Sequence, residues 1–218
     1  GIAMTAPTTL FTNARLIDPE TGSDTLGDLF VADGVIADSC KADEVVDCGG
    51  KCLAPGIVDI GVKVSEPGER HKESFASAGR AAVAGGITTI VTRPDTSPAI
   101  DTPETLEFVE RRASNDAAVN VLPMAALSKE RAGKEMTEIG FLMDAGAAAF
   151  TDCDRVVTNT KVFSRVLTYA HSLGALVIGH VQEPGLSAGG SVTSGKFATW
   201  RGLSGVSPMA ERMGLDRD

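Results

Sequence analysis

Cysteines, long apolar segments and secretion signals are scarce or missing in this chain of 218 residues. No Cys-x-x-Cys pair occurs among its four cysteines, which are Cys40, Cys48, Cys52 and Cys153. No apolar run approaches the roughly 20 residues of a membrane-spanning helix. Residues 1–5 lack the charged and apolar regions of a signal peptide. We therefore expect reduced thiols, no membrane partner and a cytoplasmic location.

Positive charge is also in short supply. The chain has 20 lysines and arginines against 29 aspartates and glutamates, which gives a formal net charge of −9. This balance argues against an anionic partner such as a nucleic-acid backbone or an acidic membrane surface. With 43% hydrophobic residues, the chain can form one sizeable core, or one domain with a small annex.

Residues 8–54 carry short apolar runs separated by turn signals. The runs lie at residues 10–11, 14–17, 28–31, 35–37 and 45–47. Asp33-Gly34, which lies between two of these runs, is a strong hairpin signal. The pattern predicts a small antiparallel β unit at the start of the chain.

One buried strand is predicted directly after this unit. Pro55-Gly56 marks its beginning and Pro67-Gly68 marks its end. The residues between these turns are too apolar for a strand with one face in water, and include Ile57, Val58, Ile60, Val62 and Val64. Such a strand is typical of the parallel sheet in an α/β barrel, where the C-terminal ends of the strands surround the active site.

Helical and strand patterns then alternate through the second segment, residues 55–218. Helices are predicted at residues 72–84, 103–115, 133–145 and 160–173, with a last one that begins at Ser207. Further strands are predicted at residues 87–92, 118–122, 147–150 and 175–179. The alternation indicates a TIM-type (β/α) barrel, but only about five of its eight βα units are present. We expect this to be the first part of a longer barrel, with an independent open α/β domain as the alternative.

Several stretches resemble one known family. Residues 55–68 keep the frame of Pro-Gly-hydrophobic-x-Asp-hydrophobic-His-x-His-x-Arg-x-Pro-Gly, which is typical of dihydroorotases in the amidohydrolase superfamily. Residues 80–89 are similar to the family's Ala-Ala-Ala-x-Gly-Gly-Phe-Thr-Thr, and residues 94–104 to its Pro-Asn-Thr-x-Pro-x-x-Asp-x-Pro-Glu. Residues 179–184 are similar to its Asn-His-Cys-Glu-Asp. The nearest group is the dihydroorotase type that is associated with aspartate carbamoyltransferase in pyrimidine synthesis.

The resemblance implies a metal site that has lost most of its ligands. The family activates water with zinc, but Gly61 and Lys63 stand where it has two metal-binding histidines. Cys153 stands where the family has a ligating aspartate, and only His180 is retained. Because an ammonium group repels a divalent ion, we expect no metal cofactor. Lys63 would instead pair with Asp152, Asp154 or Asp59, or point into solvent.

The resemblance also implies altered substrate recognition. Ser65 and Asp95 replace the arginine and the asparagine that hold the substrate's carboxylate in the family. The loss of a guanidinium and the gain of a carboxylate make the pocket unfavourable for an anion. We expect nearby Arg93 to pair with a neighbouring acid rather than to restore anion binding.

Two functions follow from the resemblance. The first is a non-catalytic dihydroorotase-like protein, with no catalytic residues, that forms an oligomer with aspartate carbamoyltransferase as its structural partner. The second is an active zinc-dependent cyclic amidohydrolase, which would convert dihydroorotate and water to carbamoyl aspartate. This enzyme would use Cys153, His180 and ligands beyond Asp218. A scaffold unrelated to pyrimidines has no positive support in the sequence.

Overall fold

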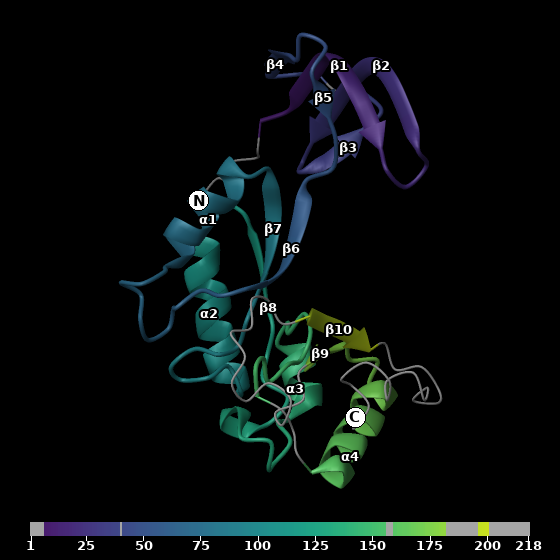
Figure 1. Cartoon of the computed structure of the whole chain (residues 1–218). Coiled ribbons are helices and arrows are strands. Elements are labelled where there is room, and N and C mark those ends of the chain that lie inside the picture. The colour runs from purple at the N-terminus through teal and green to yellow at the C-terminus, as the bar shows by residue number, and fades with distance from the viewer. Residues whose placement is uncertain (1–6, 40, 156–158, 182–195, 201–218) are drawn as a thin grey trace. The chain divides into compact units, whose positions relative to one another are not determined.

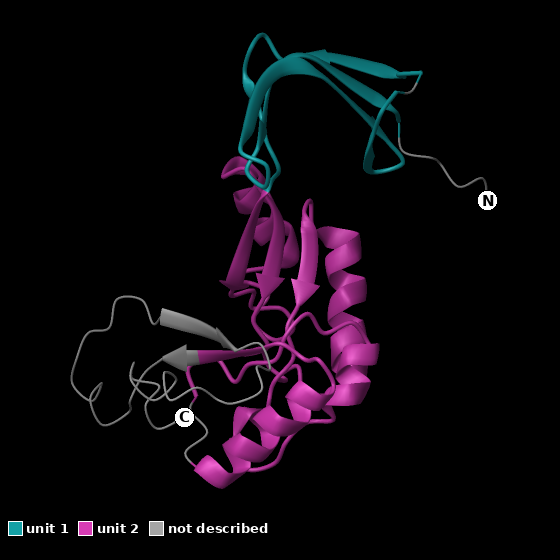
Figure 2. Ribbon diagram, turned by 90° about the vertical axis from the view of Figure 1, so that its right-hand side faces the viewer, with its two compact units in different colours: residues 1–56 teal, residues 57–218 magenta. Residues whose placement is uncertain are grey.

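A computed structural model describes most of the chain, namely residues 7–39, 41–155, 159–181 and 196–200. The chain forms two compact units, residues 1–56 and residues 57–218, which are coloured separately in Figure 2. The boundary falls between Gly56 and Ile57, directly before the strand that carries the Pro-Gly frame.

The first unit is a mixed β-sheet, which corrects the prediction of an antiparallel unit. Its strands are β1 (Thr9–Asp18), β2 (Ser23–Ala32), β3 (Val35–Ala37), β4 (Glu44–Asp47) and β5 (Cys52–Leu53) (Figure 1). The pairs β1–β2 and β2–β3 are antiparallel, whereas β4 and β5 both run parallel to β1. Turn signals mark where a strand ends but not the direction in which the next strand pairs, so the sequence pattern missed this.

The predicted hairpin at Asp33-Gly34 is confirmed. Both residues have a positive φ, of 51° and 76°, as a two-residue turn of the primed type requires, and they connect β2 to β3. The two apolar runs at residues 10–17 form one strand rather than two. An irregularity in the pairing between Phe11 and Ala14 separates them within β1.

The second unit contains a parallel sheet whose strands follow the order of the chain. It begins with β6 (Ile57–Val62), β7 (Ile87–Thr92) and β8 (Asn120–Pro123). Single parallel bridges then join Ala125 to Phe150 and Phe150 to β9 (Val177–Val181). β9 pairs antiparallel with β10 (Lys196–Trp200), a strand that the sequence pattern did not predict.

This order is the one expected for the first part of a (β/α) barrel, and the described sheet does not close on itself. The predicted strand at residues 147–150 is reduced to a bridge at Phe150, but the backbone of this segment forms hydrogen bonds with both β8 and β9. Ala148 N donates to Pro123 O over 3.0 Å, and Ile178 N donates to Phe150 O over 2.9 Å.

Three helices form where the sequence predicts them, each beginning after a capping side chain. They are α1 (Phe75–Ala84), α2 (Pro103–Asp116) and α4 (Thr160–Ser172), with Ser74, Thr102 and Asn159 as their N-caps. α1 starts three residues later than the predicted Lys72 because the Ser74 side chain accepts a hydrogen bond from Ser77 N. The predicted last helix, from Ser207, lies outside the described residues.

The predicted helix at residues 133–145 is wrong in its first half, and only α3 (Ile139–Asp144) is helical. The backbone N–H of Thr137 donates to Leu127 O over 3.1 Å, and its buried hydroxyl donates to Ala126 O over 2.8 Å. These bonds tie the segment to the loop after β8, so its backbone groups are not free to form helix. The periodicity of apolar residues could not reveal this, because the partners are distant in sequence.

The core of the second unit lies between the sheet and its helices. Its largest fully buried apolar side chains include Phe75, Leu106, Ile139, Leu142 and Phe150. No helix among the described residues is long and apolar enough to span a membrane.

The prediction that β6 is buried is wrong for most of the strand. Ile57, Val58 and Ile60 are 55–58% exposed, although Val64, just after the strand, is buried. β6 lies at the end of the described sheet with β7 as its neighbour, so its apolar side chains keep much of their surface. A run of apolar residues indicates that a strand can be buried, but it does not show whether other segments pack against the strand.

Candidate functional site

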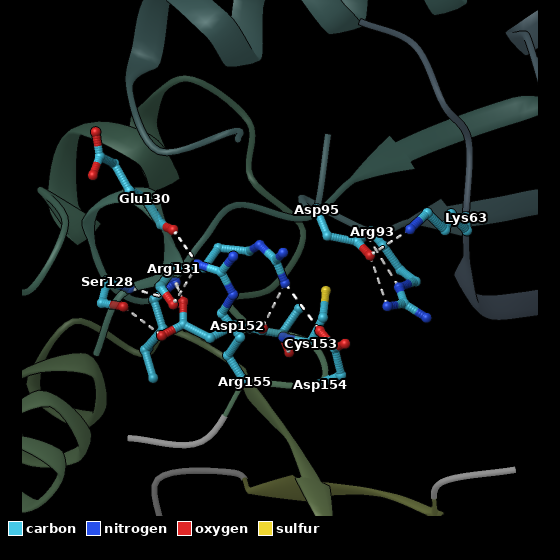
Figure 3. A network of polar contacts seen from close by, with 12 residues as sticks. Lys63, Arg93, Asp95, Ser128, Glu130, Arg131, Asp152, Cys153, Asp154 and Arg155 are labelled. Carbon is cyan, nitrogen blue, oxygen red and sulfur yellow. Dashed lines mark hydrogen bonds and ion pairs between the residues drawn. The ribbon is translucent and has the colours of Figure 1, made fainter. Parts of the chain in front are cut away.

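Polar side chains gather beyond the C-terminal ends of the parallel strands of the second unit, as Figure 3 shows. Lys63 follows β6, Arg93 and Asp95 follow β7, and further polar residues follow β8 and the bridge at Phe150. Because parallel strands end at the same edge of a sheet, residues far apart in sequence meet here.

The centre of this site is an ion triad formed by Lys63, Arg93 and Asp95. Lys63 Nζ lies 3.2 Å from Asp95 Oδ2. Arg93 binds the same carboxylate twice, through Nε to Oδ1 at 3.1 Å and through Nη2 to Oδ2 at 2.8 Å. The Asp95 side chain is only 4% exposed, so both of its oxygen atoms are engaged away from bulk water.

These contacts settle two sequence-based expectations. The hypothesis that Lys63 pairs with Asp152, Asp154 or Asp59 is wrong, because Asp95 is its partner. The expectation that Arg93 pairs with a neighbouring acid is confirmed. Several acidic residues follow strands of this sheet, and the sequence pattern does not show which of them the Lys63 side chain reaches.

Gly61 offers no side chain to a ligand, and its backbone favours glycine. It lies in β6 with a φ of 92°, at a shift in the pairing register between Ile60 and Val62. L-residues rarely adopt this left-handed region, so a histidine at this position would be strained in the present conformation.

Cys153 is a buried thiol that stays protonated at neutral pH. It is 1% exposed, and its backbone N–H donates to Thr151 Oγ1 over 3.0 Å. Burial, reinforced by the negative charge of Asp95, raises its pKa from 9.0 to about 11, although Arg93 acts in the opposite direction.

The shift in the Cys153 pKa predicts a loss of stability at high pH. Between pH 9.0 and about 11 the thiol ionises in the unfolded chain while it remains protonated in the folded one. The folded state therefore binds more protons, and stability falls across this window by up to about 2 kcal/mol. Urea unfolding at several pH values should show this decline, and Cys153→Ser should reduce it. Cys52→Ser, at an exposed thiol, should leave it unchanged; equal slopes in all three proteins would contradict the prediction.

A second buried carboxylate, Asp152, holds the loop after β8. Its Oδ1 accepts hydrogen bonds from Leu127 N at 2.9 Å and from Ser128 N at 3.0 Å, and its Oδ2 accepts one from the Ser128 hydroxyl. Burial raises the Asp152 pKa, although these hydrogen bonds oppose the shift. Arg131, in the loop after β8, adds to this connection, because its Nη1 donates to Asp152 O and to Asp154 Oδ1, each over 3.1 Å.

Glu66, which follows the Lys63 segment, is a third buried carboxylate that the sequence did not single out. Its Oε1 accepts from Arg112 Nε at 3.0 Å and from Arg112 Nη2 at 2.8 Å. Its Oε2 accepts from Phe75 N, the first residue of α1, at 3.2 Å. Glu66 thereby joins the loop after β6 to two helices.

The remaining predicted site residues contribute less to this arrangement. Ser65 is half-buried and is fixed through its backbone, since its N–H donates to Glu73 O over 3.0 Å. The Ser65 hydroxyl makes no hydrogen bond to another described residue. His180 lies in β9, but its side chain is outside the described part of the structure.

Two of the positions where the resemblance implies metal ligands do not fit a divalent ion. Gly61 has no side-chain donor atom, and Lys63 carries a positive charge that repels such an ion. Within the described ranges, no three His, Cys, Asp or Glu side chains are grouped so that they could hold a metal ion.

Comparisons with family models and with curated sequences both point to dihydroorotases. The family model described as "Dihydro-orotase-like" matches residues 50–218. A dihydroorotase from Syntrophobacter fumaroxidans is 36% identical over 96% of this chain and 50% of its own length. A dihydroorotase from Endomicrobium trichonymphae is 38% identical over 94% of this chain and 49% of its own length. The chain therefore spans about half the length of these curated relatives.

Solved structures show the same fold at lower sequence identity. An L-hydantoinase from Arthrobacter aurescens superposes with a TM-score of 0.69 and 22% identity, over 85% of this chain and 45% of that one. A dihydroorotase crystal structure gives a TM-score of 0.54 and 14% identity, over 82% and 52% of the two chains. The match of the family model to residues 50–218 shows that this chain belongs to the dihydroorotase-like family.

Proposed function

We propose that this chain is a non-catalytic dihydroorotase-like protein of pyrimidine biosynthesis and a structural partner of aspartate carbamoyltransferase. The observation that carries the proposal is the ion pair between Lys63 and Asp95 at 3.2 Å. The resemblance places a metal ligand at the first of these positions and a substrate ligand at the second. In this chain the two side chains bind each other instead.

The chemistry of the site supports the loss of metal catalysis. A catalytic zinc ion takes three protein ligands and keeps one position open for water. The Lys63 ammonium would repel such an ion, and the Asp95 carboxylate that could attract it already has three donors from Lys63 and Arg93.

The same contacts disfavour an anionic substrate. Dihydroorotate carries a carboxylate, which needs a free cation or hydrogen-bond donors. The guanidinium of Arg93 is held by Asp95 in a bidentate pair, and Ser65 supplies only a hydroxyl in place of a guanidinium. A substrate carboxylate would also meet the negative charge of Asp95.

Aspartate carbamoyltransferase enters the proposal through the resemblance. The matched motifs are nearest to the dihydroorotase type that is associated with this enzyme, and a subunit without its own reaction can still organise a partner. An oligomer with that enzyme is therefore the proposed assembly.

An active amidohydrolase is the second candidate. It is favoured by the identity of 36–38% to proteins named dihydroorotase, over 94–96% of this chain. Such an enzyme would bind zinc through Cys153, His180 and residues outside the described part of the chain.

Three measurements on the purified protein separate these functions. For a non-catalytic protein we expect much less than one zinc per chain by elemental analysis, and no formation of carbamoyl aspartate from dihydroorotate. Co-purification with aspartate carbamoyltransferase would support the proposed partnership. Stoichiometric zinc together with turnover would establish the second candidate, whereas inactivity without co-purification would refute the partnership alone.

A further inference from the structure

We propose that the ion triad of Lys63, Arg93 and Asp95 takes over the structural task of a metal ion at this site. A metal bound at the ends of parallel strands fixes those ends by attracting ligands from several of them. The triad does the same with charges that the chain itself carries, because Lys63 follows β6 while Arg93 and Asp95 follow β7. The site would then be rigid without any bound ion.

The position of the triad supports this task. The backbone bond from Arg93 N to Val62 O, at 3.0 Å, is at the C-terminal end of the β6–β7 pairing. Lys63 directly follows Val62, so the side-chain pair extends the connection between the strands just past their last backbone bond. Figure 3 shows Lys63 and Arg93 approaching the same carboxylate.

The burial of Asp95 shows why the carboxylate needs its partners. Its side chain is 4% exposed, whereas those of Arg93 and Lys63 are 20% and 57% exposed. A carboxylate removed from water is costly unless it is paired and hydrogen-bonded, and here three charged donors meet that requirement. Without Asp95, Lys63 and Arg93 would lose the carboxylate oxygen that both of them bind.

A double-mutant cycle tests the coupling between the ends of β6 and β7. Asp95→Asn should lower the folding equilibrium constant about thirtyfold, and Lys63→Met about threefold. With Asp95→Asn already present, Lys63→Met should cost nothing or restore some stability, because it removes one of two cations that repel each other. Urea unfolding of the purified chain measures all four proteins.

Lys129→Met is the matched control. Lys129 forms an ion pair of similar length, 3.0 Å, and its side chain is 51% exposed, but its partner Glu135 is 70% exposed. Its removal should change the equilibrium constant less than twofold. If Lys63→Met costs the same in both backgrounds, or no more than the control, the triad does not join the strands and the proposal fails.

Metal addition tests whether the triad replaces an ion. Ligands that bind the folded state raise the melting temperature by mass action. We expect the same melting temperature for the purified chain in chelator, in buffer and in excess zinc chloride. A decrease with chelator or an increase with zinc would overturn the proposal. These unfolding results do not depend on the carbamoyltransferase, so failure of the partnership leaves them interpretable.

Discussion

Glu66→Gln is expected to lower the free energy of unfolding by about 3 kcal/mol. The Glu66 side chain is 5% exposed and receives two hydrogen bonds from Arg112 and one from the backbone N–H of Phe75. Glutamine keeps the size of the side chain and one acceptor oxygen, but it loses the charge that pairs with Arg112. The side-chain amide of the glutamine would also place its own N–H groups opposite the N–H donors of Arg112 or Phe75, so a buried donor would be left without an acceptor.

The size of this effect follows from burial, and an exposed pair provides the control. Lys72 Nζ lies 2.6 Å from Glu69 Oε1, closer than Arg112 to Glu66, but both side chains are more than half exposed. Glu69→Gln should therefore leave the free energy of unfolding almost unchanged. Chemical denaturation of the two variants compares them directly, and equal losses would show that Glu66 does not organise the loop after β6.

Asp152→Ala should be about as destabilising, with an expected loss of about 3–5 kcal/mol. The substitution removes the acceptor of the N–H groups of Leu127 and Ser128 and of the Ser128 hydroxyl, all in a buried region. Each unsatisfied buried donor costs about 1–3 kcal/mol, and a cavity adds to this cost. The loop after β8 would lose its main attachment to the segment after Phe150.

Two further variants make the Asp152 prediction specific. Asp152→Asn keeps an oxygen that can accept from both N–H groups, so it should restore at least half of the lost free energy. Asp154→Ala removes a carboxylate that is 67% exposed and bonded to Arg131, and should cost less than about 1 kcal/mol. Thermal or urea unfolding gives the ranking, which is wrong if Asp154→Ala is as harmful as Asp152→Ala.

The parts of the fold that were predictable are those whose causes are local. Thr102 and Asn159 directly precede the helices predicted at residues 103–115 and 160–173, and each accepts hydrogen bonds from N–H groups two or three positions later. The Ser74 cap is equally local, although the predicted start at Lys72 missed it. The Asp33-Gly34 hairpin is similarly local, because two residues with positive φ suffice. Errors arose where distant groups intervened, as at residues 133–138, where bonds from Thr137 to the loop after β8 prevent helix.

The candidate site divides in the same way. The resemblance assigned Lys63, Asp95 and Cys153 to one site. It did not identify Asp95 as the partner of Lys63, nor did it single out Glu66. Many acidic side chains could have met these cations, and only the arrangement of the loops selects among them.

The sequence by itself determined the family, the alternation of strands and helices, and the presence of glycine at 61 and lysine at 63, where the resemblance implies metal ligands. These features depend on residue identity and on short spacings, both of which can be seen in the amino-acid sequence. The tertiary structure alone decided that Lys63 and Arg93 share the Asp95 carboxylate, and that Glu66 and Asp152 are buried. The physical reason is that charge pairing and desolvation depend on distances between segments, and the path of the folded backbone sets those distances.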